Sequence, residues 1–326
     1  MFSCYNGSFE DKSMKLQQLR YLSEVARRGM NVSEAAEVLH TSQPGVSKQI
    51  RALEDELGVQ VFVRHGKRLV EITEPGKAVI AIAERILAEA QNLRRAGEEF
   101  ANGKLGTFTV ATTHTQARYS LPKAVAAFKR RYPKVQLVIH QGNPTQICEQ
   151  VLAGEADLCV ATEAITDYPE LVSMPVYQWN RCVVVPPKHP LLKAPLTLEA
   201  LAQHPIVTYD FAFANRSLVQ KAFEARDLQP NVVLTALDAD VIKTYVELGL
   251  GVGILAKMAF DAKRDRTLRA IDASHLFESS TTRLGIKRGA YLRRYAYEFI
   301  ELYAPHLPRS VIERAVAGEE GSRYEL

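Results

Sequence analysis

The chain has 326 residues, of which 47% are hydrophobic and 24% are charged, so we expect a folded protein with more than one domain and exclude a disordered one. Its formal net charge of +4 is too small to indicate nucleic-acid binding by itself. The placement of the basic residues therefore matters more than their sum.

Residues 1–13 lack the cationic start and apolar core of a signal peptide. Because Met14 opens a new helix pattern, they are predicted to be an N-terminal extension, and the alternative is an upstream start. No later segment is long and apolar enough to span a bilayer. The four cysteines are scattered, without a CxxC pair or a Cys/His cluster at metal-ligand spacing. We therefore expect a cytoplasmic protein with no cofactor, no metal and no membrane partner.

Residues 14–73 are predicted to form a winged helix-turn-helix domain, whose most informative stretch is residues 31–57. In that stretch two helices follow one another across a tight turn. Ser33 is expected to cap the first helix and Ser42 the second. Pro44 suits the first turn of the second helix, where its missing N–H costs nothing. The predicted inward face of that helix consists of Val46, Ile50, Leu53 and Leu57, at steps of four, three and four.

The second helix carries polar side chains near its N-terminus, the end that a helix-turn-helix protein inserts into the major groove of DNA. Side chains of these types bond base edges and phosphates. The residues of the two helices that we expect at the DNA are Ser33, Ser42, Gln43, Pro44, Ser47, Lys48 and Arg51. An ordinary surface hairpin of two helices gives a similar pattern, so this stretch alone leaves both interpretations open.

A basic turn between two short apolar strands follows the second helix and predicts a wing. The wing residues that we expect to meet the DNA backbone or minor groove are Arg64, His65, Lys67 and Arg68. Such contacts add affinity without sequence information. The wing favours DNA binding over a plain surface hairpin.

Residues 74–103 are predicted to form one long helix with apolar side chains at coiled-coil intervals. The predicted dimerisation seam consists of Val79, Ile82, Ile86, Leu93 and Phe100. Two chains joined along this seam could reach both half-sites of one promoter. The alternative is that the helix packs on its own domain, since three heptads are the minimum for a coiled coil.

Residues 104–309 alternate short strands with helices, and the same strand-helix-strand-helix-strand order occurs twice. We predict an α/β domain with two lobes of parallel strands, like that of periplasmic binding proteins. The predicted parts are lobe I at 104–176 and 281–309, lobe II at 177–280, and a C-terminal tail at 310–326. Two unrelated strand-helix units remain the alternative.

The loop of residues 112–120 joins the first strand of lobe I to its first helix and is rich in small hydroxyl side chains. A helix N-terminus favours an anion, and two-lobed domains bind ligands at the carboxyl ends of their strands. The expected effector-binding residues are Thr113, Thr115, Gln116, Thr162 and Asn215. Alternatively, the threonines only cap the helix.

The sequence contains no evident catalytic constellation. Residues 249–253 are glycine-rich, but they follow a helix and lead into a strand, so they indicate a helix stop and not a phosphate loop. His114 has no acid or nucleophile within its own loop. We expect no enzymatic activity, and the alternative is a plain binding protein or a transferase built on the two lobes.

The winged domain with its Ser42-Gln43-Pro44 to Phe62 run, the long helix and the two-lobed domain together resemble the LysR-type transcriptional regulators. Within that family, the segments TTHTQARY and ALDADVIKTYVELGLGVGILA are similar to the CysB/Cbl branch. That branch governs genes of sulfur assimilation and cysteine synthesis.

The resemblance implies a bacterial activator that binds promoter DNA as a homodimer or homotetramer and contacts RNA polymerase. It implies that Thr113, Thr115, Gln116 and Thr162 bind a small anionic effector: sulfate, thiosulfate, O-acetylserine or N-acetylserine. The chain departs from the branch at Ala214-Asn215, where the branch has Thr-Gly. An amide thus replaces a hydroxyl at the effector site.

Overall fold

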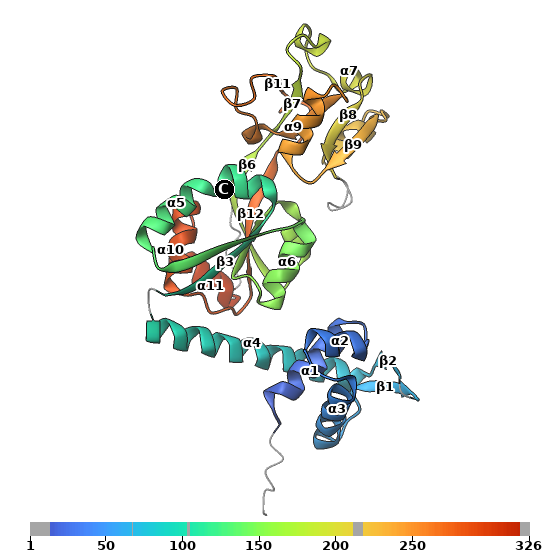
Figure 1. Ribbon diagram of the computed structural model, residues 1–326, viewed down its shortest axis with the longest axis vertical. Helices are drawn as coiled ribbons and strands as arrows, with labels where there is room; N and C mark the ends of the chain where they lie inside the picture. The colour runs from blue at the N-terminus through green and yellow to red at the C-terminus, as the bar shows by residue number, and fades with distance from the viewer. Residues whose placement is uncertain (1–13, 67, 103–104, 211–217, 320–326) are drawn as a thin grey trace, which may run out of the picture. The chain divides into compact units, whose positions relative to one another are not determined.

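The residues that the computed structural model describes are 14–66, 68–102, 105–210 and 218–319 (Figure 1). The chain divides into two compact units, Met1–Gly97 and Glu98–Leu326, and the long helix α4 (Glu74–Asn102) runs across the division. Among the described helices, none has the length and apolar character that a membrane span requires.

The described part of the first unit is a three-helix domain with a two-stranded antiparallel wing, which confirms the predicted winged helix-turn-helix. Its elements are α1 (Leu16–Arg27), α2 (Val32–Val38), α3 (Gln43–Leu57), β1 (Phe62–His65) and β2 (Arg68–Ile72). Val46, Ile50 and Leu53 of α3 are buried in its core. Their spacing of four and three residues places them on one face of the helix.

The predicted N-terminal cap of α3 is confirmed, and that of α2 is wrong. Ser42 caps α3 as expected, with its Oγ accepting a hydrogen bond from the N–H of Gly45 at 3.3 Å. The cap of α2 is Asn31 and not Ser33, because the Oδ1 of Asn31 accepts from the N–H of Glu34 at 3.2 Å. Asparagine and serine are equally good caps, so the earlier residue begins the helix and Ser33 lies exposed in the first turn.

The end of α3 also differs from the sequence prediction. Leu57, expected on the inward face, is 40% exposed because the helix ends there and Gly58 turns the chain with a φ of +69°. The strand expected from Val59 begins only at Phe62. The N–H groups just before and at its start donate to a side chain of α3 and not to a partner strand.

Helix α4 begins by packing on its own winged domain. Ala83 is buried in that core, and Val79 and Ile86 are partly buried against it. The remaining seam residues are exposed: Ile82 by 47%, Leu93 by 75% and Phe100 by 88%. The first half of the helix thus packs on its own domain, as the alternative interpretation had it. Val79 and Ile86 are therefore not free to form a seam with a second chain.

The second unit contains two lobes, each built on a five-stranded sheet in its described residues (Figure 1). The elements of lobe I are β3 (Gly106–Thr112), η1 (Gln116–Ser120), α5 (Pro122–Arg131), β4 (Val135–Gln141), α6 (Pro144–Ala153), β5 (Leu158–Ala161), η2 (Glu163–Asp167), β6 (Leu171–Trp179), β12 (Ser280–Lys287), α10 (Arg294–Tyr303) and α11 (Arg309–Ala317). Helices α5, α10 and α11 cover one face of the sheet and α6 the other.

Lobe II repeats the plan of lobe I. Its elements are β7 (Arg181–Val185), η3 (Pro190–Leu192), α7 (Leu198–Ala202), β8 (Ile206–Tyr209), α8 (Leu218–Glu224), β9 (Val232–Ala236), α9 (Ala239–Glu247), β10 (Val252–Ala256), η5 (Lys257–Ala259) and β11 (Arg269–Asp272). The sheet orders are β4-β3-β5-β12-β6 and β11-β7-β10-β8-β9. In each copy the first strand lies between the second and third and runs parallel to both, so the predicted duplication is confirmed.

Two paired strands connect the lobes. Strand β6 of lobe I is separated from β7 of lobe II by Asn180 alone, and β12 returns antiparallel to β6 with Ser280 opposite Trp179. Pairing along both crossings makes a two-stranded ribbon between the two sheets, which we call the hinge.

Two further segments test sequence predictions. The predicted C-terminal tail contains α11, whose Ile312, Ala315 and Val316 are buried in the core of lobe I, so the lobe extends beyond residue 309. The glycine-rich run is a helix stop as expected: Gly249 has a φ of +81° after α9, and a Cβ on Gly251 would lie 2.2 Å from the carbonyl oxygen of Pro205.

Candidate DNA-binding and effector-binding sites

Helix α3 presents its predicted DNA-contacting face to solvent. The exposed residues of this set are Ser33, Ser42, Gln43, Pro44, Lys48 and Arg51, and Ser47 is half-buried. All but Ser33 lie at or near the N-terminal half of α3, opposite the buried Val46 and Ile50. Their contact with DNA stays a prediction, and the helix leaves them available for it.

A buried carboxylate fixes the wing to α3. Glu54 is 5% exposed, and its Oε1 accepts hydrogen bonds from the N–H groups of Val61 at 2.8 Å and Phe62 at 3.2 Å. Its Oε2 lies 2.6 Å from the Nη2 of Arg64. Arg64 was expected at the wing tip, but it lies within β1 and its guanidinium faces Glu54, so it holds the wing in place.

The rest of the wing tip is partly described. His65 and Arg68 are exposed and opposite one another in the hairpin, where they remain available to a phosphate. Lys67 lies outside the described residues. The wing therefore offers two of its four predicted contacts in the described part of the chain.

The effector threonines gather at one edge of lobe I. Strands β3 and β5 are adjacent and parallel, so Thr113 after β3 and Thr162 after β5 follow strand ends at the same edge. Both threonines are partly exposed. Thr115 is 8% exposed. In lobe II, the hydroxyl of Tyr209 accepts a hydrogen bond from the N–H of Ala256 at 3.2 Å. Burial raises the pKa of Tyr209, which therefore stays protonated as a neutral donor or acceptor.

Gln116 has a different environment from the threonines. It is 1% exposed, and its Nε2 donates to the Oγ1 of Thr282 at 3.1 Å while its Oε1 accepts from the hydroxyl of Tyr177. Tyr177 belongs to β6 and Thr282 to β12, the two strands of the hinge. Two of the four hydrogen bonds that the amide can make are therefore used on the hinge. Asn215 lies outside the described residues.

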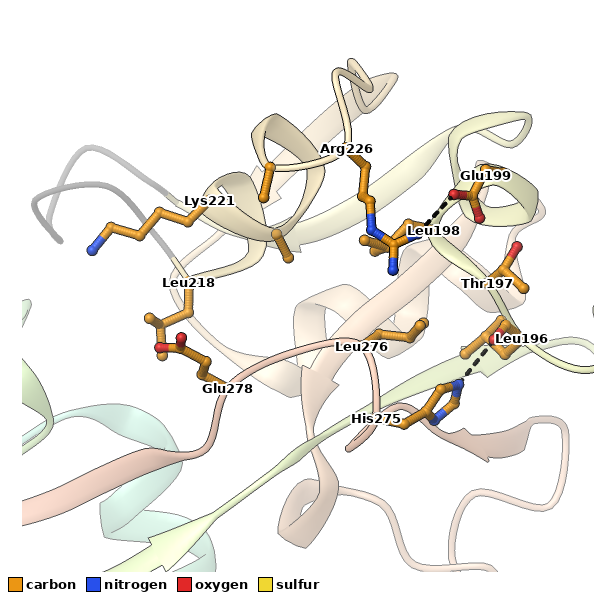
Figure 2. Close-up of a pocket in the computed structure, with 12 residues that line it drawn as sticks. Leu196, Thr197, Leu198, Glu199, Leu218, Lys221, Arg226, His275, Leu276 and Glu278 are labelled. Carbon is orange, nitrogen blue, oxygen red and sulfur yellow. Dashed lines mark hydrogen bonds and ion pairs between the residues drawn. The ribbon is translucent and has the colours of Figure 1, made fainter.

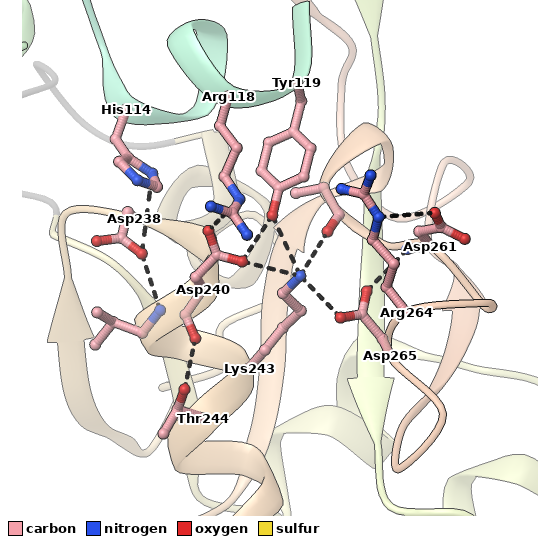
Figure 3. Close-up of polar contacts among 12 residues, drawn as sticks. His114, Arg118, Tyr119, Asp238, Asp240, Lys243, Thr244, Asp261, Arg264 and Asp265 are labelled. Atoms are coloured by element: carbon pink, nitrogen blue, oxygen red, sulfur yellow. Dashed lines mark hydrogen bonds and ion pairs between the residues drawn. The ribbon is translucent and has the colours of Figure 1, made fainter.

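A charged cluster that the sequence did not reveal joins the loop of residues 112–120 to α9 of lobe II (Figure 3). The hydroxyl of Tyr119 donates to the Oδ1 of Asp240 at 2.8 Å, and the Nε of Arg118 lies 2.7 Å from its Oδ2. Lys243 lies 3.2 Å from the same carboxylate. Burial alone would raise the pKa of Asp240, but hydrogen bonds from Tyr119 and Lys243 lower it below its ordinary value.

His114 faces this cluster too. Its Nδ1 lies 4.0 Å from the Oδ1 of Asp238, so the acid that its own loop lacks comes from the other lobe. His114, Asp238 and Asp240 offer ligand atoms within 4.8 Å of one another, the spacing of a metal site. Arg118 and Lys243 already neutralise Asp240, which argues against a cation there.

One sequence signal could have located this cluster. Lys243 follows Ile242 on the inward side of α9, among residues that are otherwise apolar. A lysine is rarely buried without a paired charge, so its position predicts a carboxylate nearby. Asp240, three residues earlier on the same helix, is one such carboxylate, but the second, Asp265, was not readable because it lies in a separate loop.

A separate cavity of about 600 Å³ lies in lobe II between α7, α8 and the segment before β12 (Figure 2). Leucines line its interior, and Arg226 pairs with Glu199 at 3.3 Å on its rim. His275 is bound to the carbonyl oxygen of Leu196 at 2.9 Å. Of the predicted effector residues that the structure describes, none lines this cavity.

Two family models match the chain, and together they cover most of it. The model described as bacterial regulatory helix-turn-helix protein, lysR family, matches residues 16–77, and that described as LysR substrate binding domain matches residues 101–308. The chain belongs to the LysR family of regulators.

Relatives that match nearly the full length of this chain are named as transcriptional regulators. The HTH-type transcriptional regulator CysB of Burkholderia cenocepacia is 56% identical over 314 residues, covering 96% of this chain and 100% of its own. The regulator cbl of Escherichia coli is 46% identical over 316 residues, covering 96% and 100%. A crystal structure of the cofactor-binding domain of the Cbl regulator superposes with a TM-score of 0.63 at 42% identity, covering 65% of this chain and 93% of that one.

These comparisons decide between the two classes of function that the sequence left open. The relatives are transcriptional regulators and not enzymes, and LysR regulators bind promoter DNA and small effectors and form oligomers. The chain is therefore a DNA-binding transcriptional regulator with an effector-binding domain. A transferase or plain binding protein is not favoured.

Proposed function

We propose that this LysR regulator controls genes of sulfur assimilation and cysteine synthesis, in response to a small sulfur-related anion or an acetylated serine bound between its lobes. The similarity to CysB and Cbl over nearly the full chain supports the choice of genes. The observation that carries the effector site is the position of Thr113 and Thr162 after adjacent parallel strands of lobe I.

The chemistry of the site suits an anion that binds reversibly. Hydroxyl groups and the first N–H groups of the helix after β3 are neutral donors, which select an anion by geometry more than by charge. Arg118, the one fixed positive charge of the loop, is paired with Asp240. We infer that Thr113, Thr115 and Thr162 are the direct ligands, that Gln116 acts from the hinge, and that Asn215 adjusts the choice of effector.

The winged domain would transmit the effector's state to DNA. We infer that Gln43, Ser47 and Lys48 read or grip the major groove, and that His65, Lys67 and Arg68 bind backbone. Lobe closure would change the geometry of a homodimer or homotetramer, and so the spacing of its α3 helices on the promoter. We further propose that the protein acts in the cytoplasm, where it associates with the nucleoid through DNA. There it would activate transcription through contact with RNA polymerase.

Calorimetric titration of the full-length chain with sulfate, thiosulfate, O-acetylserine and N-acetylserine tests the effector. We expect at least one to bind, and Thr113→Ala to weaken it by about tenfold or more, since a lost hydrogen bond to a charged group is worth about 1.5–3 kcal/mol. Thr107→Ala is the matched control, because Thr107 is exposed at the other end of the same strand. If none of the four compounds binds, the sulfur assignment is refuted, and the assignment of the chain as a transcriptional regulator is unaffected.

A further inference from the structure

The cluster around Asp240 crosses the crevice between the lobes, and the two sides contribute different groups (Figure 3). Lobe I contributes Arg118 and Tyr119, both in η1 directly after the predicted anion-binding threonines. Lobe II contributes Asp240 and Lys243 from α9. Every hydrogen bond or ion pair between these two pairs therefore forms only when the lobes are closed.

Groups of lobe II alone make up the socket for these contacts. The Nζ of Lys243 donates to the carbonyl oxygen of Ala259 at 3.0 Å and lies 3.0 Å from the Oδ1 of Asp265, both within lobe II. Tyr119 then inserts from lobe I: it accepts from Lys243 at 3.2 Å, donates to Asp240, and its ring packs against the apolar core of lobe II. The ring also lies 5.6 Å from the Lys243 ammonium.

The contacts within lobe II would still satisfy the socket without Tyr119. Asp240 keeps Lys243 at 3.2 Å, and Lys243 keeps Asp265 and Ala259. Arg118, whose side chain is 51% exposed, returns to water. Opening of the lobes would therefore leave no buried charge without a partner. This distinguishes a contact that can be released from an ion pair in a permanent core.

We propose that Asp240 and Lys243 form an electrostatic latch with Arg118 and Tyr119, which holds the lobes closed and couples lobe closure to anion affinity at the adjacent threonines. The latch acts on lobe closure whether or not an effector is bound. Its coupling to anion affinity rests on the proposed effector site. An anion that needs both lobes binds more weakly when the closed state is less populated. The latch residues are positioning residues, because none of them needs to touch the anion.

Hydrogen–deuterium exchange of the full-length chain without effector tests the latch. In Asp240→Asn, whose side chain keeps its shape and loses its charge, we expect amides of η1 and α9 to exchange several-fold faster, with the hinge strands and the winged domain unchanged. Arg118→Gln provides the same test at an exposed residue, so a folding defect at Asp240 does not remove the test. Unchanged exchange in both variants overturns the latch.

The matched control is Arg226→Gln. It breaks the pair with Glu199, which is also an exposed arginine-carboxylate contact but lies wholly within lobe II. We expect exchange in η1 and α9 to stay as in the wild type. Faster exchange there in the control would overturn the assignment, since any lost surface charge would then have the same effect.

The coupling is tested by titrating the same variants with whichever of sulfate or N-acetylserine the wild type binds, at constant ionic strength. We expect both latch variants to bind about fivefold or more weakly, within the usual range of allosteric coupling, and the double variant to lose less than the product of the two. Faster exchange with unchanged affinity overturns the coupling but not the latch. No binding by the wild type refutes the proposed effectors, and the exchange result still decides the latch.

Discussion

Glu54 of α3 and Arg64 of the wing form an ion pair, with 2.6 Å between Oε2 and Nη2, and the same carboxylate accepts the N–H groups of Val61 and Phe62. One side chain therefore sets the angle at which the wing leaves α3. Since both elements are predicted to meet the same DNA, their relative orientation decides whether both can bind at once.

Removing this carboxylate is expected to destabilise the winged domain. Glu54→Ala leaves two backbone N–H groups and a partly buried guanidinium without acceptors, which should lower the free energy of unfolding by about 2–4 kcal/mol. Chemical denaturation followed by circular dichroism measures it. Glu56→Ala, at an exposed position two residues along the helix, should change stability by less than about 0.5 kcal/mol. An equal effect of both variants would contradict the anchoring role.

Substitutions in α3 should weaken operator binding without unfolding the domain. We expect Gln43→Ala to relax sequence preference, and Lys48→Ala to weaken binding to all sequences and reduce its salt dependence by about one phosphate contact. A mobility-shift assay at several salt concentrations measures both. Lys77→Ala is the control, because Lys77 is an exposed lysine of the same unit that pairs with Glu74 on α4. If Gln43 and Lys48 behave like this control, the proposed docking is wrong.

The exposed part of α4 should hold two chains together. Ile82, Leu93 and Phe100 lie within about 20° of one another around the helix axis, on a face that the chain itself leaves open. Burying a leucine or phenylalanine contributes about 1.5–3 kcal/mol, so Leu93→Ala and Phe100→Ala should each weaken self-association about tenfold or more.

Sedimentation velocity over a range of protein concentrations measures that change. Leu192→Ala is a suitable control, since Leu192 is 39% exposed on lobe II and outside α4. Association that is unchanged in the two α4 variants would move the dimer contact to another surface.

Acid should remove one ion pair of lobe II in a defined pH window. Hydrogen bonds from Lys257 and Ser274 lower the pKa of Asp272 from 3.8 to about 2. The folded state thus holds the carboxylate ionised where the unfolded state protonates it, so this stability is present above about pH 4 and lost as the pH falls towards 2.

Comparison with Asp272→Asn isolates that contribution. Because the Asp272 side chain is 47% exposed, solvent screening limits the effect to about 0.2–1 kcal/mol. The difference in melting temperature between wild type and variant should shrink between pH 4 and pH 2. A difference that stays constant across this range would show that the ion pair does not stabilise the fold.

Much of the architecture followed from the sequence alone. The spacing of Val46, Ile50 and Leu53 fixed the inward face of α3, and Ser42 and Pro44 fixed its start. The repeated strand and helix order predicted the three parallel strands of each lobe. The prediction of wholly parallel sheets was wrong, because the strands that cross between the lobes join each sheet in antiparallel pairs. The confirmed features follow from periodicity and from local hydrogen bonds, which a short stretch of sequence contains in full.

The tertiary structure decided which partners the polar side chains take. Arg64, a predicted DNA contact, pairs with Glu54, and Gln116, a predicted effector ligand, bonds Thr282 and Tyr177 of the hinge; both site roles stay predictions. Tyr119 meets Asp240 across 121 positions of sequence. Periodicity shows which side chains face inward, but the partner of a buried polar group depends on how distant segments pack, which no local pattern encodes.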